Sequence, residues 1–258
     1  MGVFAGPTDD WWNLTGGTDI LRTNIATEQV IQDGLVLNLD AGVSSSYPGS
    51  GTSWNNLSGT GNSGTLYGSV GYDSANGGSL VFGGRPENTD YFGITDIFNV
   101  EGVTNYSASL WIKIDSAESG IDSRFFWHGS YGVLIYKGGD NKLYFNLTTS
   151  SVPGGAKTDT QVNILFSSYF DVWVNIAISY DGTIMKLYVN GDLKGSRTII
   201  GVISPLVQPS TLWLGALPLG FINFWTACNM SQVSIYNRAL TAQEIQQNFN
   251  ATRGRFGV

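Results

Sequence analysis

Apolar and polar side chains alternate from Tyr106 to Asp115, and this period of two predicts a β-strand with one buried face. Trp111 is the exception, because it falls on the polar side of the alternation. The segment from Val172 to Tyr180 alternates in the same way, with Val172 on the apolar side. Both segments are therefore predicted to be strands that cover a core.

Two tight turns follow the second of these strands. Asp181-Gly182 and Asn190-Gly191 favour two-residue hairpin turns, because both central positions of such a turn need positive φ. The apolar positions between them return to the same face, so residues 172–196 are predicted to form a three-stranded meander. Further strands are predicted at 35–40, 79–83, 132–137, 142–148, 161–166, 211–215 and 231–236.

One short helix is predicted near the C-terminus. Thr241 is followed three residues later by Glu244, which is the pattern of a capping box at a helix N-terminus. Leu240 is placed to pack on Ile245 across this cap, and Ile245 and Phe249 share one helix face because they lie four residues apart.

Composition agrees with a chain of short strands and many turns. Glycine accounts for 34 of 258 residues, which is about twice its usual share of roughly 7%. Charged residues make up only 13% and hydrophobic residues 42%. With about ten strands and one helix, the chain is predicted to be all-β, an antiparallel two-sheet sandwich with one short C-terminal helix.

Residues 1–32 lack this periodicity and are predicted to be an extended N-terminal arm before a sandwich at 33–258. Five acidic residues against one basic residue give residues 1–33 a charge of −4. Because ordering a chain costs entropy, such an arm must lay apolar side chains on some surface. We predict that it docks on a neighbouring subunit, and that deleting it leaves a folded domain that no longer assembles. The docking side chains are predicted to be Trp11, Trp12, Ile20, Leu21 and Ile25.

Charge and residue order argue against four features: a nucleic-acid partner, membrane insertion, an internal disulfide framework and a signal peptide. The net charge is −7, and no basic cluster is present to neutralise phosphates, so nucleic acid is not expected as a partner. The segment from Leu212 to Phe224 is largely apolar, but Pro218 and the glycines around it interrupt a helix, so membrane insertion is not expected. The single cysteine, Cys228, excludes an internal disulfide framework. The start from Met1 to Asp10 has no basic or apolar run, so no signal peptide is expected.

Several stretches carry a family likeness. They are the first core strand with its loop, the meander turns, the segment around the start of the C-terminal helix and the extreme N-terminus. Their ranges are Asp33–Gly42, Ser46–Gly59, Tyr180–Thr183 with Leu187–Gly191, Ile235–Thr241 with Glu244–Ile245, and Met1–Pro7. On the first four of these stretches, residues 33–258 resemble the concanavalin A-like, laminin G-like jelly roll, and most of all the copies found in tailed-phage virion proteins. The N-terminal stretch resembles the start of such phage proteins. The fold hosts lectins, hydrolases and structural modules, so the likeness alone does not define an activity.

The resemblance implies a non-enzymatic structural component of a phage virion, in a capsid decoration, tail or appendage. Its partners would be other virion proteins or copies of itself, and it would be assembled in the host cytoplasm. The alternative is a carbohydrate-binding adhesion module that recognises a glycan on the host surface. A glycan array distinguishes the two hypotheses.

Calcium-binding relatives of this fold use a loop that matches residues 43–70 here. That loop contains no acidic residue in this chain, and Asn56 stands where the family often has aspartate. Calcium takes six to eight oxygen ligands with several carboxylates among them. Asp40 and Asp73 are the nearest acidic side chains, and each is more simply a strand-end or turn residue. No cofactor is expected, and bound calcium is the remaining alternative.

The sequence does not predict an active site. Glycoside hydrolases of this fold use two carboxylates that flank the scissile bond, and no strand carries such a pair with a further glutamate. His128 is the only histidine, and the Ser130 beside it has no nucleophile-elbow pattern, so a serine triad is not expected. The protein is therefore predicted not to be an enzyme.

Two segments are candidate binding surfaces. The apolar loop at 217–225 predicts an assembly interface, although a core-covering loop would have the same composition. Its interface side chains would be Leu219, Phe221, Phe224 and Trp225. The aromatic segment at 125–131 predicts a glycan site, because sugar rings stack on exposed aromatic side chains, although such a run also fits a core strand. Its glycan-binding side chains would be Trp127, His128 and Tyr131.

Overall fold

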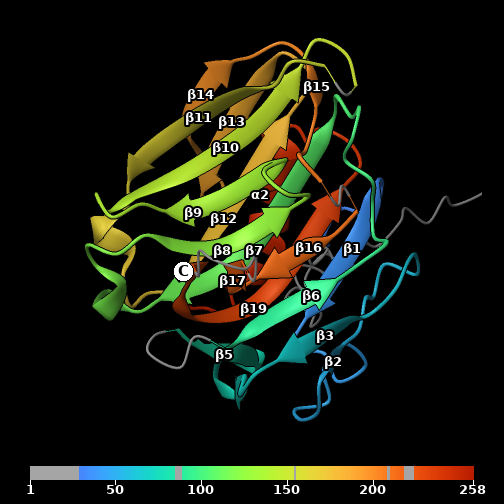
Figure 1. Cartoon of the computed structure of the whole chain (residues 1–258). Coiled ribbons are helices and arrows are strands. Elements are labelled where there is room, and N and C mark those ends of the chain that lie inside the picture. The colour runs from blue at the N-terminus through green and yellow to red at the C-terminus, as the bar shows by residue number, and fades with distance from the viewer. Residues whose placement is uncertain (1–28, 85–88, 154, 208–209, 218–223) are drawn as a thin grey trace, which may run out of the picture.

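The computed structural model describes residues 29–84, 89–153, 155–207, 210–217 and 224–258 as two stacked antiparallel sheets (Figure 1). The eight-stranded sheet runs in the order β14 (Asp192–Thr198), β13 (Ile184–Val189), β12 (Val174–Tyr180), β7 (Tyr106–Ile114), β19 (Ala227–Tyr236), β5 (Ser79–Gly83) and β4 (Gly71–Asp73), with β1 (Leu35–Asp40) also paired to β19.

The nine-stranded sheet forms the second layer. It runs in the order β11 (Thr158–Leu165), β10 (Lys142–Ser150), β9 (Val133–Lys137), β8 (Ser123–His128), β16 (Leu212–Leu214), β6 (Tyr91–Ile94), β3 (Gly64–Tyr67) and β2 (Ser53–Trp54), with β15 (Val202–Ile203) paired to β10. The remaining elements are a hairpin of β17 (Ala216–Leu217) and β18 (Phe224–Trp225), the helix α2 (Ala242–Arg253) and 3-10 turns at Ala75–Gly77, Ser116–Glu118 and Ser167–Tyr169.

The predicted all-β jelly-roll sandwich with one C-terminal helix is confirmed. The strands β1 and β5 begin and end where the alternation predicts, and β12, β13 and β14 form the predicted meander. The inward orientation predicted for Val172 is wrong. Its side chain is exposed and the strand begins two residues later, at Val174, because Asp171 before it adopts a left-handed conformation.

The core lies between the two sheets and is built from every second residue of the long strands. In β7 and β12 the inward side chains are fully or almost fully buried, as they are in β10 of the facing sheet. Because successive side chains of a strand point to opposite faces, the residues between them lie on the two outer faces of the sandwich. These outer faces are where ligands and partners have access.

The helix α2 explains why Trp111 interrupts the polar side of β7. Trp111 points outward and is covered by the C-terminal segment, with ring centroids 5.8 Å from Phe249 and 4.1 Å from Phe256. Its indole Nε1 donates a hydrogen bond of 2.8 Å to Thr252 Oγ1. The outward tryptophan is therefore the point at which α2 packs on the eight-stranded sheet.

The capping box of α2 is confirmed. The backbone N–H of Glu244 donates to Thr241 Oγ1, and the backbone N–H of Thr241 donates to the Glu244 carboxylate at 2.8 Å. Arg238 also donates to this carboxylate through both terminal nitrogens. This arginine is the main reason that the pKa of Glu244 falls to about 2.

The described chain starts at residue 29, at the end of the predicted arm. The carbonyl oxygen of Gln29 accepts a hydrogen bond from Gln247, and the backbone N–H of Ile31 donates to Asn248 Oδ1 at 2.8 Å. Residues 29–31 are thus held on α2. The arm side chains predicted to dock on a neighbour lie outside the described residues: Trp11, Trp12, Ile20, Leu21 and Ile25.

Candidate functional site

The outer face of the nine-stranded sheet carries a row of side chains that the strand register places side by side. The row crosses Thr65 in β3, Gly93 in β6, Trp213 in β16, Trp127 in β8 and Leu134 in β9. Figure 1 shows these five strands next to one another in the nine-stranded sheet. The neighbouring residues along each strand point into the core instead. Segments far apart in the sequence therefore form one continuous surface.

A hollow of about 250 Å³ opens in this row at Gly93. A methyl group added to Gly93 would lie 3.5 Å from the ring of Tyr67 and 3.7 Å from the rings of Trp213 and Tyr91. These are ordinary van der Waals distances, so a single small apolar group placed there touches all three rings at once. Three aromatic side chains from three strands thus converge on one point.

Hydroxyl groups form the polar part of the same hollow. The serine and threonine residues that line the hollow have side-chain hydroxyl groups without a hydrogen-bond partner among the described residues. A hydroxyl group can both donate and accept a hydrogen bond. No charged side chain lines the hollow among the residues that the structure describes. The site therefore suits an uncharged ligand that carries both apolar and hydroxyl groups. The hydroxyl-bearing residues at its wall are Ser63, Thr65, Thr95 and Thr211.

The aromatic wall of the hollow is itself well packed. Tyr67 and Tyr91 stack with ring centroids 4.5 Å apart and planes 12° apart, and Tyr67 is 45% exposed. On the other side of Tyr91, the ring of Trp225 lies 6.2 Å away. Burial, and then the proximity of Tyr67, raise the pKa of Tyr91, so it stays neutral at physiological pH. The rings are thus held in place before any ligand arrives.

The prediction that Trp127 and His128 bind a glycan is contradicted by their burial. Trp127 is 1% exposed, because Trp213, Leu134 and Tyr131 pack around it on the outer face. His128 points the other way, into the core, and is 0% exposed. Tyr131 is partly exposed at the edge of Trp127, and its contact with a glycan stays a prediction.

His128 has a structural environment that does not suit catalysis. Its Nε2 lies 2.9 Å from the carbonyl oxygen of Phe98, which only accepts, so this nitrogen carries the proton. Its Nδ1 lies 3.0 Å from the hydroxyl of Tyr106 and accepts from it. Burial lowers the pKa of His128 to about 4. The neutral ring therefore serves as a bridge between the two sheets.

The apolar loop at 217–225 is only partly described. Leu219 and Phe221 lie outside the described residues, and of Phe224 the structure describes only that it belongs to β18. Trp225 is 5% exposed against its own sandwich, which contradicts its predicted place in an exposed interface. It packs beside Tyr91 because the hairpin of β17 and β18 pairs Trp225 with Ala216 at the end of the aromatic wall.

The residues considered as calcium ligands in the sequence form hydrogen bonds within the fold instead. Both oxygens of Asp40 accept from Arg255, at 2.9 Å and 2.7 Å, and Asp73 accepts from the backbone N–H of Ala75. Asn56 braces its loop by accepting from the backbone N–H of Asn38. Among the described residues there is no group of three His, Cys, Asp or Glu side chains placed to hold a metal ion. In the same part of the chain, no helix has the length and apolarity to cross a membrane.

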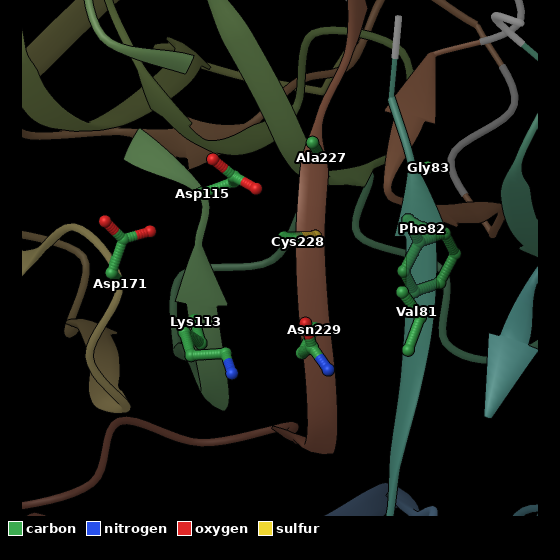
Figure 2. A pocket seen from close by; sticks show the side chains of 9 residues that line it. All are labelled: Val81, Phe82, Gly83, Lys113, Asp115, Asp171, Ala227, Cys228 and Asn229. Atoms are coloured by element: carbon green, nitrogen blue, oxygen red, sulfur yellow. The ribbon is translucent and has the colours of Figure 1, made fainter. Parts of the chain in front are cut away.

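A second hollow, of about 320 Å³, lies on the outer face of the eight-stranded sheet. Figure 2 shows Lys113 and Asn229 next to each other on neighbouring strands, with Asp115 and Asp171 at one side. The polar groups here already serve the fold, because Asp115 caps the turn at Ala117 and Asp171 accepts from the backbone of Ser116. This hollow is therefore a weaker candidate than the one at Gly93.

The hollow at Gly93 was missed by sequence reasoning. It is built from β3, β6 and β16, which have three or four residues each and are too short for a clear alternation. The available signal is the stretch Tyr91–Ile94, in which Tyr91 and Gly93 are partly exposed while Phe92 and Ile94 are buried.

Comparisons with known proteins agree with this architecture. The family model described as the concanavalin A-like lectin/glucanases superfamily matches residues 86–246. Mouse pappalysin-1 is 29% identical over 165 residues, which are 58% of this chain and 10% of pappalysin-1. The chain belongs to the concanavalin A-like lectin/glucanases superfamily, in its laminin G-like branch.

Solved structures show the same fold. The receptor binding domain of botulinum neurotoxin C/D mosaic serotype superposes with a TM-score of 0.65 at 17% identity, covering 85% of this chain and 51% of that one. The binding domain of Paraclostridial Mosquitocidal Protein 1 gives a TM-score of 0.65 at 21% identity, covering 85% and 52%. The chain thus spans about half the length of these structures.

Proposed function

We propose that this protein is a carbohydrate-binding module that holds a neutral sugar in the hollow at Gly93. The proposal rests on the convergence of Tyr67, Tyr91 and Trp213 on Gly93, beside hydroxyl groups that have no hydrogen-bond partner among the described residues. A pyranose ring has C–H groups on its faces and hydroxyls around its edge. The C–H groups would contact the three rings, and the hydroxyls would bond to the serine and threonine side chains.

The size and charge of the hollow support this assignment. Its volume of about 250 Å³ lies just below the roughly 300–1,000 Å³ of sites for drug-sized ligands, which suits one sugar ring. An uncharged lining favours a neutral sugar over a sialic or uronic acid, since a carboxylate would leave water without gaining a cation. The described lining also has no carboxylate for hydrolysis, so we expect binding without turnover.

The test uses a glycine-to-valine substitution that fills the hollow. Gly93 has no positive φ and lies in a strand, so Gly93→Val is compatible with the backbone and places its methyl groups among the three rings. The matched control is Gly71→Ala, in β4 of the opposite sheet, where the added carbon meets Val81 at 3.5 Å.

Ligand-observed NMR with glucose, galactose, mannose and N-acetylglucosamine at millimolar concentration gives the readout. We expect wild type and Gly71→Ala to bind at least one of them, and Gly93→Val to bind none. The proposal fails if wild type binds none, or if a folded Gly93→Val binds as well as wild type.

Attachment to a phage virion is a further proposal, which rests on the sequence resemblance of residues 33–258 and of the N-terminus. It is compatible with sugar binding, because an adhesion module needs both a ligand site and an anchor. Because residues 29–31 bond to α2, a cut after residue 28 keeps these hydrogen bonds. We expect the chain lacking residues 1–28 to fold, to keep its sugar binding and to lose assembly. Normal incorporation of the truncated chain into particles would refute the anchoring role.

A further inference from the structure

A second aromatic platform lies on the same outer face, three strands away from the hollow at Gly93. Tyr136 in β9 and Tyr144 in β10 are register partners, and their rings stack with centroids 4.8 Å apart and planes 7° apart. The guanidinium of Arg124 lies 4.6 Å from the centroid of Tyr136. This arrangement repeats the stack of Tyr67 and Tyr91.

The register places the two platforms on one line that runs across the strands. Gly93 in β6 and Leu134 in β9 both belong to the row described above. Tyr91 lies two residues from Gly93 along β6, and Tyr136 lies two residues from Leu134 along β9. Because neighbouring strands are about 4.8 Å apart, the three steps from β6 to β9 separate the platforms by about 14 Å. This separation is longer than a single sugar ring.

Polar side chains surround the second platform. The hydroxyl of Tyr136 donates to Gln161 Oε1 at 3.0 Å, and that of Tyr144 donates to Asp140 at 2.7 Å. The bond to Asp140 raises the pKa of Tyr144 to about 12. Gln161 and Asp140 are exposed, so the amide and the carboxylate have further hydrogen-bonding capacity toward a ligand.

We infer that Arg124, Tyr136 and Tyr144 form a second sugar subsite, and that the ligand is a glycan chain of several sugars laid across the strands from β3 to β10. The inference rests on the proposed function of the hollow at Gly93. The side chain of Trp127 lies between the two subsites, and its buried indole N–H has no acceptor among the described residues. A chain that passes over this point links the two platforms.

The experiment measures affinity against chain length by isothermal titration calorimetry on the full chain. The probes are glucose and its α-1,4-, β-1,3- and β-1,4-linked oligomers of two to six units. We expect the affinity of wild type to rise at least about tenfold between the shortest and the longest oligomer of the linkage that binds.

The double variant Tyr136→Ala/Tyr144→Ala should bind short oligomers as wild type does, and it should lose the gain in affinity with oligomer length. The control is Tyr72→Ala, a partly exposed tyrosine of the opposite sheet, and it should keep the gain. Because the double variant removes packing, the single variant Gln161→Ala, on an exposed strand position, should also reduce the gain while leaving the melting temperature unchanged.

The outcomes separate this inference from the proposed function. Binding that is lost in Gly93→Val but does not depend on chain length overturns the second subsite alone, as does a double variant that keeps the gain. Binding that Gly93→Val leaves intact overturns the proposed function. Absence of binding by every glucose oligomer overturns the second subsite, and it overturns the proposed function as well if none of the four single sugars binds.

Discussion

The buried His128 makes the stability of the sandwich depend on pH between pH 5 and pH 7, a range in which histidine is the side chain with an ordinary pKa. Its pKa falls to about 4 in the folded protein, mainly because burial disfavours the charged ring. In the unfolded chain it titrates near its ordinary value of about 6.5. Between these values the unfolded chain takes up a proton that the folded protein does not, so stability falls as the pH is lowered.

The size of the effect follows from the two pKa values. A pKa difference of about 2.5 corresponds to about 3.4 kcal/mol at most, at 1.36 kcal/mol for each pH unit. Going from pH 7 to pH 5 covers part of this window, and we expect a loss of about 2 kcal/mol in the free energy of unfolding. His128 is the single histidine of the chain, so the loss is assigned to one group.

Urea denaturation at fixed ionic strength, followed by tryptophan fluorescence, measures this at pH 7, 6 and 5. The control is His128→Gln, which keeps polar groups toward Phe98 and Tyr106 but cannot take up a proton. We expect this variant to be less stable at pH 7 and nearly insensitive to pH above 5. A wild type whose unfolding free energy is flat from pH 7 to pH 5 would show that burial of His128 does not couple folding to pH, as would a variant whose unfolding free energy has the same slope with pH as wild type.

Three substitutions test individual contacts that stabilise the sandwich. Thr241→Ala removes the cap of α2 and should lower stability by about 1 kcal/mol; an unchanged melting temperature would count against the capping box. Lys137→Met leaves three backbone carbonyls without the buried ammonium that they bind, and should cost more than about 3 kcal/mol in the same denaturation assay. Gly215→Ala should cost about 1–3 kcal/mol, because φ is +79° and the new carbon would lie 2.5 Å from Phe82. If Lys137→Met or Gly215→Ala leaves the denaturation midpoint unchanged, the corresponding contact does not stabilise the fold.

The sequence is sufficient for the parts of the fold where one strand or helix contains the whole signal. Alternation over six to nine residues places β1 and β7, and Asn190-Gly191 places the turn between β13 and β14. The cap at Thr241 is equally local, because all its partners lie within three residues. In each case the physical cause acts between near neighbours, so the pattern can be read without the fold.

The candidate site depends on pairing between distant segments, which no local pattern contains. Gly93 becomes the floor of a hollow only because β6 lies between β3 and β16, whose sequences are far from each other. The same reason explains the mistaken expectation for Trp127. Its position on an outer face follows from alternation, but its burial follows from Trp213 and Tyr131, which other strands and turns bring to it.

A glycan array read with labelled wild type, Gly71→Ala and Gly93→Val in parallel tests whether the hollow at Gly93 binds a neutral sugar. We predict that wild type and Gly71→Ala bind the same set of neutral glycans and that Gly93→Val, folded by its melting curve, binds none of them. A wild type that binds no neutral glycan, or a Gly93→Val variant that retains the binding pattern of wild type, would contradict a sugar site at Gly93.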